Sequence, residues 1–230
     1  MKRIVGIAST PNRLEGLKHT IERLSDQVDS IHVHLNGYNS VPKVKEKNVT
    51  FHLSKKNIGA VGKFKVLEYV DKSEEFYFFT CDDDIIYPAN YVAINIEQYE
   101  KGTIQSSHGK IFSKFPITDY KYGDISGYYF GAEIKSKKQI HIAGTGVCMM
   151  DSSVALQIPY DTFTTKNMVD VWVGCWAEIN KVKQYILTHP AGWLVPNDKV
   201  TQKGSIWEKT VQDDSIQVQI INHYFKKEDI

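Results

Sequence analysis

The stretch Phe76–Pro88 reads FYFFTCDDDIIYP, an aromatic run that leads directly into three carboxylates. An apolar run without polar alternation predicts a strand that is buried on both faces. Asp82, Asp83 and Asp84 then stand at the carboxyl end of this strand, where like charges repel one another and lose hydration if they are buried. The stretch therefore requires something that compensates these charges.

The residues around this strand alternate between strand and helix patterns. Apolar, β-branched runs predict strands over 3–9, 30–38, 48–54 and 74–81. Apolar residues three and four apart predict helices over 14–24 and 60–70, and Pro88 is expected to open another that extends to about Glu100. This order favours an α/β fold with a mostly parallel sheet and helices on both faces. Ligands of such sheets bind beyond the carboxyl ends of the strands, which is where the aspartates stand.

The second half of the chain is less regular. Residues 109–138 are rich in Gly, Tyr, Lys and Ser, and they predict a long excursion or a small hairpin over the sheet. Further runs predict a strand over 139–150, a helix over 169–181, a strand over 184–190 and a helix over 213–226.

A divalent cation is the compensation that the three aspartates favour. Alternate side chains of an extended backbone point the same way, so Asp82 and Asp84 can face one site while Asp83 points elsewhere. Oxygen ligands suit Mg²⁺ or Mn²⁺, which usually also bind substrate phosphates. The alternative is that the aspartates cap the following helix and solvate a turn.

Composition limits the partners and the compartment. Apolar residues make up 42% of the chain, and the formal net charge of +1 argues against nucleic acid as a partner. Cys81, Cys148 and Cys175 match no zinc motif and are expected to be buried free thiols. No secretory signal and no membrane-spanning run is visible, so we expect a cytoplasmic protein. The charge pattern leaves a peripheral membrane contact open.

Polar residues also follow the other predicted strands. Arg13 in STPNR can form two hydrogen bonds to a phosphate or a base, or it can be an exposed residue of a first helical turn. Asn36 in HLNGY is a polar strand end, although Asn-Gly is also a turn signal. The segment KKNIGAVGKF could bind an anion through glycine backbone N–H groups, the N-terminus of a helix and Lys63. The alternative is that its lysines form a solvated basic face. Asp170 is a possible general base or a helix N-cap.

Taken in order, these segments resemble the glycosyltransferases of the GT-A fold, a Rossmann-like α/β architecture. CDDDIIYP resembles their Asp-X-Asp motif, and STPNR, HLNGY, KKNIGAVGKF and KNMVDVWVGCWAEI resemble segments around their nucleotide-sugar and acceptor. The resemblance implies that Asp84 and Asp82 bind Mn²⁺ or Mg²⁺ and that Asp170 is the catalytic base. Many relatives have a second acid before this base, where Val169 stands here. It implies that the donor is contacted by Thr10, Pro11, Arg13, Asn36, Asn57, Gly59, Lys63, Asp82 and Asp83.

The resemblance leaves the third metal ligand open between His189, Asp198 and His223. It implies a single domain over 1–230, with a nucleotide-binding half over about 1–108 and an acceptor half over about 109–230. Gly144 and Gly146 would let donor and acceptor approach the backbone. Aromatic residues that could stack on an acceptor sugar, or equally pack in the core, are Tyr120, Tyr122, Tyr128, Tyr129, Phe130, Trp172, Trp176 and Trp193.

The expected function is transfer of a sugar, expected to be UDP-linked, to a hydroxyl of a glycan or glycolipid with inversion at the anomeric carbon. One alternative is a metal-dependent nucleotidyltransferase, although STPNRLEG lacks the glycine-rich, lysine-bearing loop usual after the first strand of such enzymes. Another alternative is a non-catalytic domain that binds a sugar nucleotide or a glycan.

Overall fold

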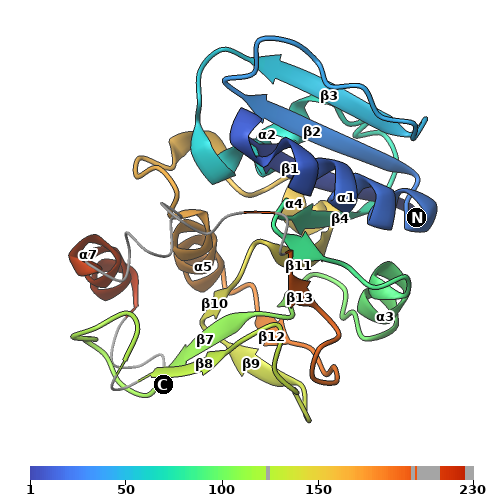
Figure 1. Ribbon diagram of the computed structural model, residues 1–230. Coiled ribbons are helices and arrows are strands. Elements are labelled where there is room, and N and C mark those ends of the chain that lie inside the picture. The colour runs from blue at the N-terminus through green and yellow to red at the C-terminus, as the bar shows by residue number, and fades with distance from the viewer. Residues whose placement is uncertain (123–124, 198–199, 201–212, 226–230) are drawn as a thin grey trace.

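The computed structural model describes residues 1–122, 125–197, 200 and 213–225. Its largest element is an eight-stranded sheet with the order β3-β2-β1-β4-β11-β6-β12-β9 (Figure 1). Strands β3, β2, β1 and β4 run parallel, β11 runs antiparallel to both its neighbours, and β12 is parallel to β6 and antiparallel to β9. The strands are β1 Lys2–Ser9, β2 Ser30–Asn36, β3 Val49–Ser54, β4 Phe76–Cys81, β6 Ile104–Ser106, β9 Lys138–Ile140, β11 Val147–Asp151 and β12 Gln184–Ile186.

Helices cover both faces of this sheet, as the sequence predicts. On one face, α1 (Leu14–Leu24) and α3 (Tyr91–Glu97) pack against Val5, Ile7 and Phe79. On the other, α2 (Gly62–Lys65), α4 (Ser152–Ala155) and α5 (Val169–Ile179) pack against Ile4 and Phe78. Successive residues of β1 and β4 therefore enter opposite cores, which is why these strands are apolar without alternation. The predicted α/β fold is confirmed.

A second, antiparallel sheet has the order β10-β7-β8 and lies in the lower part of Figure 1. It contains β7 (Gly109–Phe112), β8 (Ile125–Tyr128) and β10 (Ile142–Ala143). A third apolar cluster joins Phe112 and Ile142 of this sheet to α5 and to α7 (Ser215–Tyr224). The hairpin expected within 109–138 is confirmed.

Several elements differ from the sequence prediction. The strand expected over 139–150 is divided among β9, β10 and β11, because Gly144, Thr145 and Gly146 form a turn between the last two. The helix expected over 60–70 is only α2, flanked by 3₁₀ turns at Gly59–Val61 and Val66–Tyr69. Helix α3 begins at Tyr91 rather than at Pro88. Strand β6 and the two-residue pair β5 (Ile85–Ile86) and β13 (Val195–Pro196) are too short to show a period.

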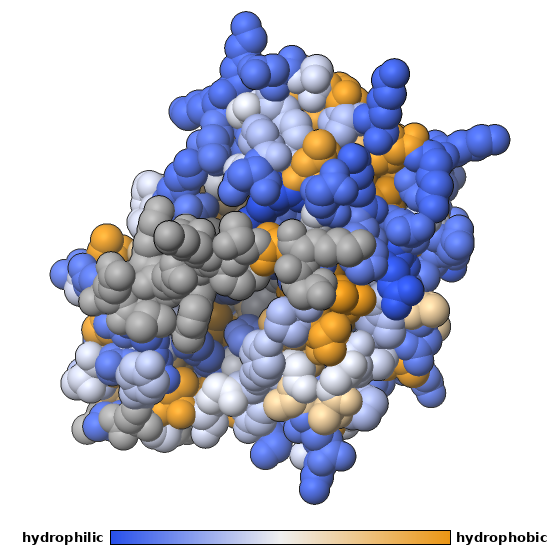
Figure 2. Space-filling view, viewed as in Figure 1, coloured by the Kyte–Doolittle hydropathy of each residue, from blue (hydrophilic) through white to orange (hydrophobic). Residues whose placement is uncertain are grey.

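Expectations from composition can also be compared with the structure. Cys81, Cys148 and Cys175 are buried and free, as predicted. Among the described residues, no helix has the length and apolar character that a membrane crossing requires. On the face that Figure 2 shows, hydrophilic residues predominate at its upper end, with smaller apolar groups between them.

Gly6 sets how closely α2 can approach β1. A Cβ added there would lie 2.3 Å from the carbonyl oxygen of Lys63 and 2.8 Å from the ring of Phe78. We predict that Gly6→Ala lowers the free energy of unfolding by about 1–3 kcal/mol through overpacking. Urea unfolding measures this change. Gly127→Ala in β8, where no atom lies within 4 Å of the added Cβ, is the control, and equal losses in both variants would contradict the argument.

The histidine pair of the β2–β3 edge predicts a pH dependence of stability. His32 Nδ1 lies 3.1 Å from His52 Nε2, and His52 stacks on Tyr69. Burial, with the nearby His32 and His34, lowers the pKa of His52 from 6.5 to about 4. Between pH 4 and 6.5 His52 is protonated in the unfolded chain and neutral in the folded chain. The free energy of unfolding therefore rises as the pH increases from 4 to 6.5. We expect His52→Phe to reduce this slope in urea unfolding measured across the range, and an unchanged slope would show that His52 is not its source.

Candidate functional site

The three aspartates stand where β4 ends, next to the carboxyl end of β1. Their exposure alternates, although Asp83 and Asp84 lie in a turn between β4 and β5 (Ile85–Ile86) and not in the extended backbone that the sequence predicts: the side chains of Asp82 and Asp84 are 39% and 21% exposed, and that of Asp83 is only 4% exposed. None of the three caps α3, whose N-cap is Asn90. Asp82 and Asp84 are therefore the accessible carboxylates, and Asp83 belongs to the interior.

Arg13 lies against two of these carboxylates. Its Nη1 is 3.1 Å from Asp83 Oδ1 and 2.6 Å from Asp84 Oδ2, and its backbone N–H bonds to the carbonyl of Thr10. Burial alone would lower the pKa of Arg13, but the two carboxylates outweigh it and raise that pKa. Burial raises the pKa of Asp83 to about 7 against the opposing charge of Arg13. The exposed-arginine alternative is wrong, since Arg13 is the counter-ion of the aspartate cluster.

Lys63 is the second cation, and it comes from α2 on the other side of β1. Its side chain is 2% exposed, and its ammonium donates to Asp82 and, at 3.3 Å, to the carbonyl oxygen of Thr145. Burial alone would lower the pKa of Lys63, but the charges of Asp82 and Asp170 reverse that and raise it. The lysine is held in its charged form inside the protein.

The turn formed by Gly144, Thr145 and Gly146, here the 144–146 turn, joins these groups to Asp170. Thr145 donates to Asp170 Oδ1 from its backbone nitrogen at 2.9 Å and from its hydroxyl at 2.5 Å. A Cβ on Gly146 would lie 2.2 Å from Asp82 Oδ2, so any other residue there would displace that carboxylate. Asp170 is in the first turn of α5, whose N-cap is Met168, so the N-cap alternative is wrong.

His108 is a residue of this site that the sequence analysis missed. Its ring packs on Gly144, where an added Cβ would lie 2.7 Å from the ring. The ring centroids of Tyr129 and Phe130 lie 6.2 and 6.0 Å away. Burial lowers the pKa of His108, while the charges of Asp170 and Asp82 oppose the shift. A single histidine between a strand and a glycine matches no sequence motif. Only the tertiary structure shows that His108 lies at this site.

The predicted Asn-x-Gly loop is held by Asn36. The buried Asn36 amide accepts from the nitrogen of Ile58 at 2.9 Å and donates to the carbonyl of Gly59 at 3.1 Å. Asn57 Oδ1 accepts from the nitrogen of Gly59, whose φ is +77°. The structure thus brings Asn36, Asn57 and Gly59 together, and their contact with a donor stays a prediction. Thr10 is half-buried and Pro11 exposed in the turn before Arg13.

No third metal ligand is identified. Among the residues that the structure describes, no group of three His, Cys, Asp or Glu side chains could hold an ion. His189 is buried and stacks on Trp193, and His223 lies exposed on α7 against Tyr224. Asp198 lies outside the described residues. Asp82 and Asp84 carry the hard oxygen ligands that Mg²⁺ or Mn²⁺ takes. Lys63 is bound to Oδ1 of Asp82 and Arg13 to Oδ2 of Asp84, so the other oxygen of each carboxylate would hold an ion whose shell substrate phosphates and water complete.

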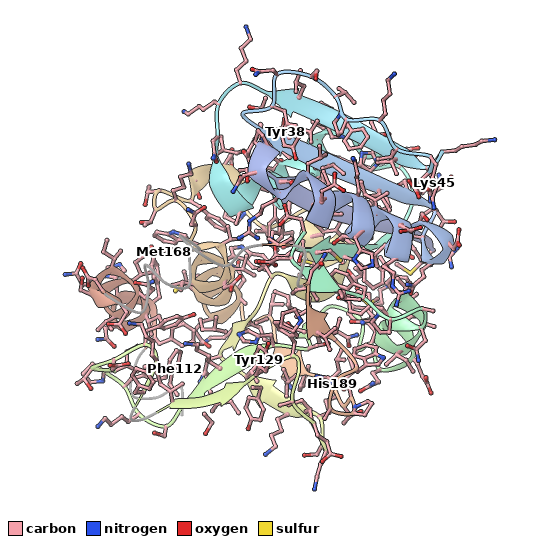
Figure 3. The ribbon with its side chains drawn as sticks, viewed as in Figure 1. Tyr38, Lys45, Phe112, Tyr129, Met168 and His189 are labelled. Atoms are coloured by element: carbon pink, nitrogen blue, oxygen red, sulfur yellow. The ribbon has the colours of Figure 1, made fainter. Side chains whose placement is uncertain are left out.

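The structure divides the aromatic candidates into core and surface. Tyr120 is buried in the third cluster, and Trp176 packs against the core under α5. Trp172 stacks on Phe163, and Trp193 packs near Tyr91. Tyr122 and Tyr129 are 66% and 47% exposed, and of these two Tyr129 contacts a residue of the site, His108. Figure 3 shows Tyr129 near the middle of the view, where the two sheets meet.

Comparison with solved structures agrees with this architecture. The inositol-1-phosphate CTP transferase from T. maritima is 12% identical over 93% of this chain and 97% of its own, with a TM-score of 0.52. HddC from Yersinia pseudotuberculosis, complexed with GMP-PN, is 16% identical over 73% and 84%, with a TM-score of 0.43. A197 from STIV is 10% identical over 85% and 84%, with a TM-score of 0.43. No protein-family model and no curated protein sequence matches the chain.

The first of these similarities shows the fold, which is GT-A-like. At this low identity it does not choose between glycosyl and nucleotidyl transfer. The expectation of a GT-A-like α/β fold is confirmed, and the assignment to the glycosyltransferases within it stays a prediction.

The Lys63–Asp82 pair predicts opposite effects of its two partners on stability. Removal of Asp82 by Asp82→Ala leaves a buried ammonium with Asp170 as its remaining counter-ion. We expect a loss of about 2 kcal/mol, below the ~3–5 kcal/mol of a fully buried pair because Asp82 is 39% exposed. Lys63→Met removes the buried charge, and water can then hydrate the partly exposed carboxylate of Asp82. We therefore expect this variant to be as stable as the native protein or more stable. Urea unfolding at pH 7 measures both, and an equal loss in both variants would contradict this assignment.

Proposed function

We propose that the chain is a metal-dependent glycosyltransferase that moves a sugar from a nucleotide-sugar, with UDP as the expected nucleotide, to a hydroxyl of a glycan. The observation that carries the proposal is the 144–146 turn. Thr145 of this turn donates to the Asp170 carboxylate and accepts from the ammonium of Lys63, which is also bound to Asp82. A carboxylate held beside a cationic, phosphate-binding corner suits removal of a proton from an attacking hydroxyl.

The donor diphosphate is proposed to bind at Asp82 and Asp84 through a divalent ion. That ion would neutralise the charge that builds on the leaving diphosphate. Arg13 and Lys63 lie on either side of this corner, and each is already positioned by a carboxylate. They supply fixed positive charge that needs no reorganisation during the reaction.

Asp170 is proposed to act on the acceptor. Both hydrogen bonds from Thr145 reach the same oxygen, Oδ1, which leaves Oδ2 without a hydrogen bond to the described residues. Oδ2 takes the hydroxyl proton while the acceptor oxygen forms its bond to the anomeric carbon and the bond from that carbon to the diphosphate breaks. A single displacement of this kind inverts the anomeric centre, and the nucleoside diphosphate leaves.

Nucleotidyl transfer is the second candidate, and the name of one solved structure supports it. The solved structure that shows the fold is named as a CTP transferase. A sugar phosphate would then attack the α-phosphate of a nucleoside triphosphate, with Lys63 and Arg13 as the cationic contacts. The loop STPNRLEG argues against it, because it offers no glycine-rich, lysine-bearing cradle for a triphosphate. A non-catalytic domain that binds a sugar nucleotide is the remaining alternative.

The products separate these candidates. Incubation with a panel of UDP-sugars and glycan acceptors should release UDP. Incubation with nucleoside triphosphates and sugar phosphates should release no pyrophosphate. Pyrophosphate release would instead establish nucleotidyl transfer, and binding of UDP without any product would indicate a non-catalytic domain.

Two substitutions test the assigned roles. We expect Asp84→Ala to weaken Mn²⁺-dependent binding of UDP by at least about 100-fold in calorimetry, because a metal ligand is lost. Asp161→Ala, at an exposed carboxylate of a 3₁₀ turn, is the control.

Asp170→Asn should keep UDP affinity and lower turnover by about 10²–10⁴-fold. Unchanged metal-dependent affinity in the first variant, or full turnover in the second, would reject the corresponding role.

A further inference from the structure

Tyr129 presents an aromatic face beside the candidate site. Its side chain is 47% exposed, although its ring is held by neighbours. The His108 ring meets it nearly perpendicularly, at 86°, and the Phe130 ring centroid is 4.4 Å away. The backbone at Gly131 also approaches it, since an added Cβ would lie 2.7 Å from the ring. An exposed ring with so little freedom is suited to binding a ligand at a small entropic cost.

His108 places an unpaired polar group next to this ring. Its Nδ1 is buried and has no hydrogen bond within the described residues. Buried polar atoms in proteins almost always have a partner, so an unpaired one at a candidate site indicates a ligand or a water. Burial lowers the pKa of this imidazole, while the charges of Asp170 and Asp82 oppose the shift, so both carboxylates act on it.

The position of His108 is fixed to the same turn that holds Asp170. Its carbonyl accepts from the nitrogen of Gly144 at 2.7 Å, and its nitrogen donates to Ser106 Oγ at 3.1 Å. Ser106 Oγ in turn donates to the carbonyl of Gly144 at 2.8 Å. Because the next residue, Thr145, binds Asp170, His108 and the proposed base are held as one unit.

We propose that Tyr129, His108 and Asp170 form the subsite of the acceptor, and that the acceptor is a pyranose. The C–H face of the sugar lies on the Tyr129 ring, one hydroxyl bonds to His108, and the reacting hydroxyl reaches Asp170 Oδ2. A sugar ring has an apolar face and a polar rim, which is the combination that an aromatic face with a few convergent polar groups recognises. This inference rests on the proposed function for the role of Asp170, although its ligand class rests on Tyr129 and His108.

Neighbouring charges support this position for the ligand. Burial raises the pKa of the Tyr129 phenol, and the carboxylate of Asp84 adds to the shift. Tyr129 therefore lies within the field of a proposed metal ligand on one side and contacts His108 on the other. A sugar on this ring would lie next to His108, which is held on the turn that binds the proposed base.

Saturation-transfer NMR with a panel of methyl hexopyranosides, in the presence of UDP and Mn²⁺, tests the subsite. We expect at least one glycoside to bind, and Tyr129→Ala to weaken it about tenfold or more. Tyr129→Phe keeps the ring and should bind as the native protein does, and His108→Gln should weaken the glycoside. Tyr122→Ala removes a tyrosine that is 66% exposed in the same segment and serves as the matched control. Thermal unfolding establishes that each variant is folded.

The outcomes distinguish failure of the subsite from failure of the proposed function. The inference is overturned if no glycoside binds to a protein that binds UDP, or if Tyr129→Ala binds the glycoside as tightly as the native protein. It is equally overturned if Tyr122→Ala causes the same loss as Tyr129→Ala. If Tyr129→Ala weakens the glycoside while Asp84→Ala leaves UDP affinity unchanged, the subsite stands and the proposed donor site fails.

Discussion

The charge balance at the end of β4 is the constraint on which the candidate site depends. Three successive carboxylates at the edge of a buried sheet repel one another, and the chain places Lys63 and Arg13 beside them from the two sides of β1. The two cations differ in burial, because Lys63 is 2% exposed and Arg13 is 22% exposed. The ion pairs hold the corner together and fix positive charge at the proposed position of the diphosphate.

Glycines allow these charges to come together. Gly6 lets the backbone of α2 approach β1, and Gly146 leaves room for the carboxylate of Asp82. The 144–146 turn lies between β10 of the small sheet and β11 of the large one, so it connects both sheets at the site. Through Thr145 it touches Lys63 and Asp170, and through Gly144 it touches His108. A single turn therefore relates the donor side of the proposed site to the acceptor side.

The shared fold explains why the donor side alone does not identify the reaction. Carboxylates, a divalent ion and two cationic side chains serve any transferase that breaks a bond to a nucleotide phosphate group. What differs between glycosyl and nucleotidyl transfer is the nucleophile and the atom it attacks. Asp170, His108 and Tyr129 are the residues that bear on this choice, since they are proposed as a base, a hydrogen-bonding group and an aromatic face for the acceptor.

The sequence by itself determined the parallel half of the sheet and the two-faced core, because strand and helix periods are local properties. It also indicated Arg13, Lys63 and Asp170 individually, since each follows a strand or begins a helix. Only the tertiary structure decided which carboxylate each cation pairs with, that residues 139–150 divide between two sheets, and that His108 belongs to the site. The physical reason is that these are contacts between segments distant in sequence. Their geometry depends on the packing of α2, α5 and the small sheet against the strand ends, which no local pattern encodes.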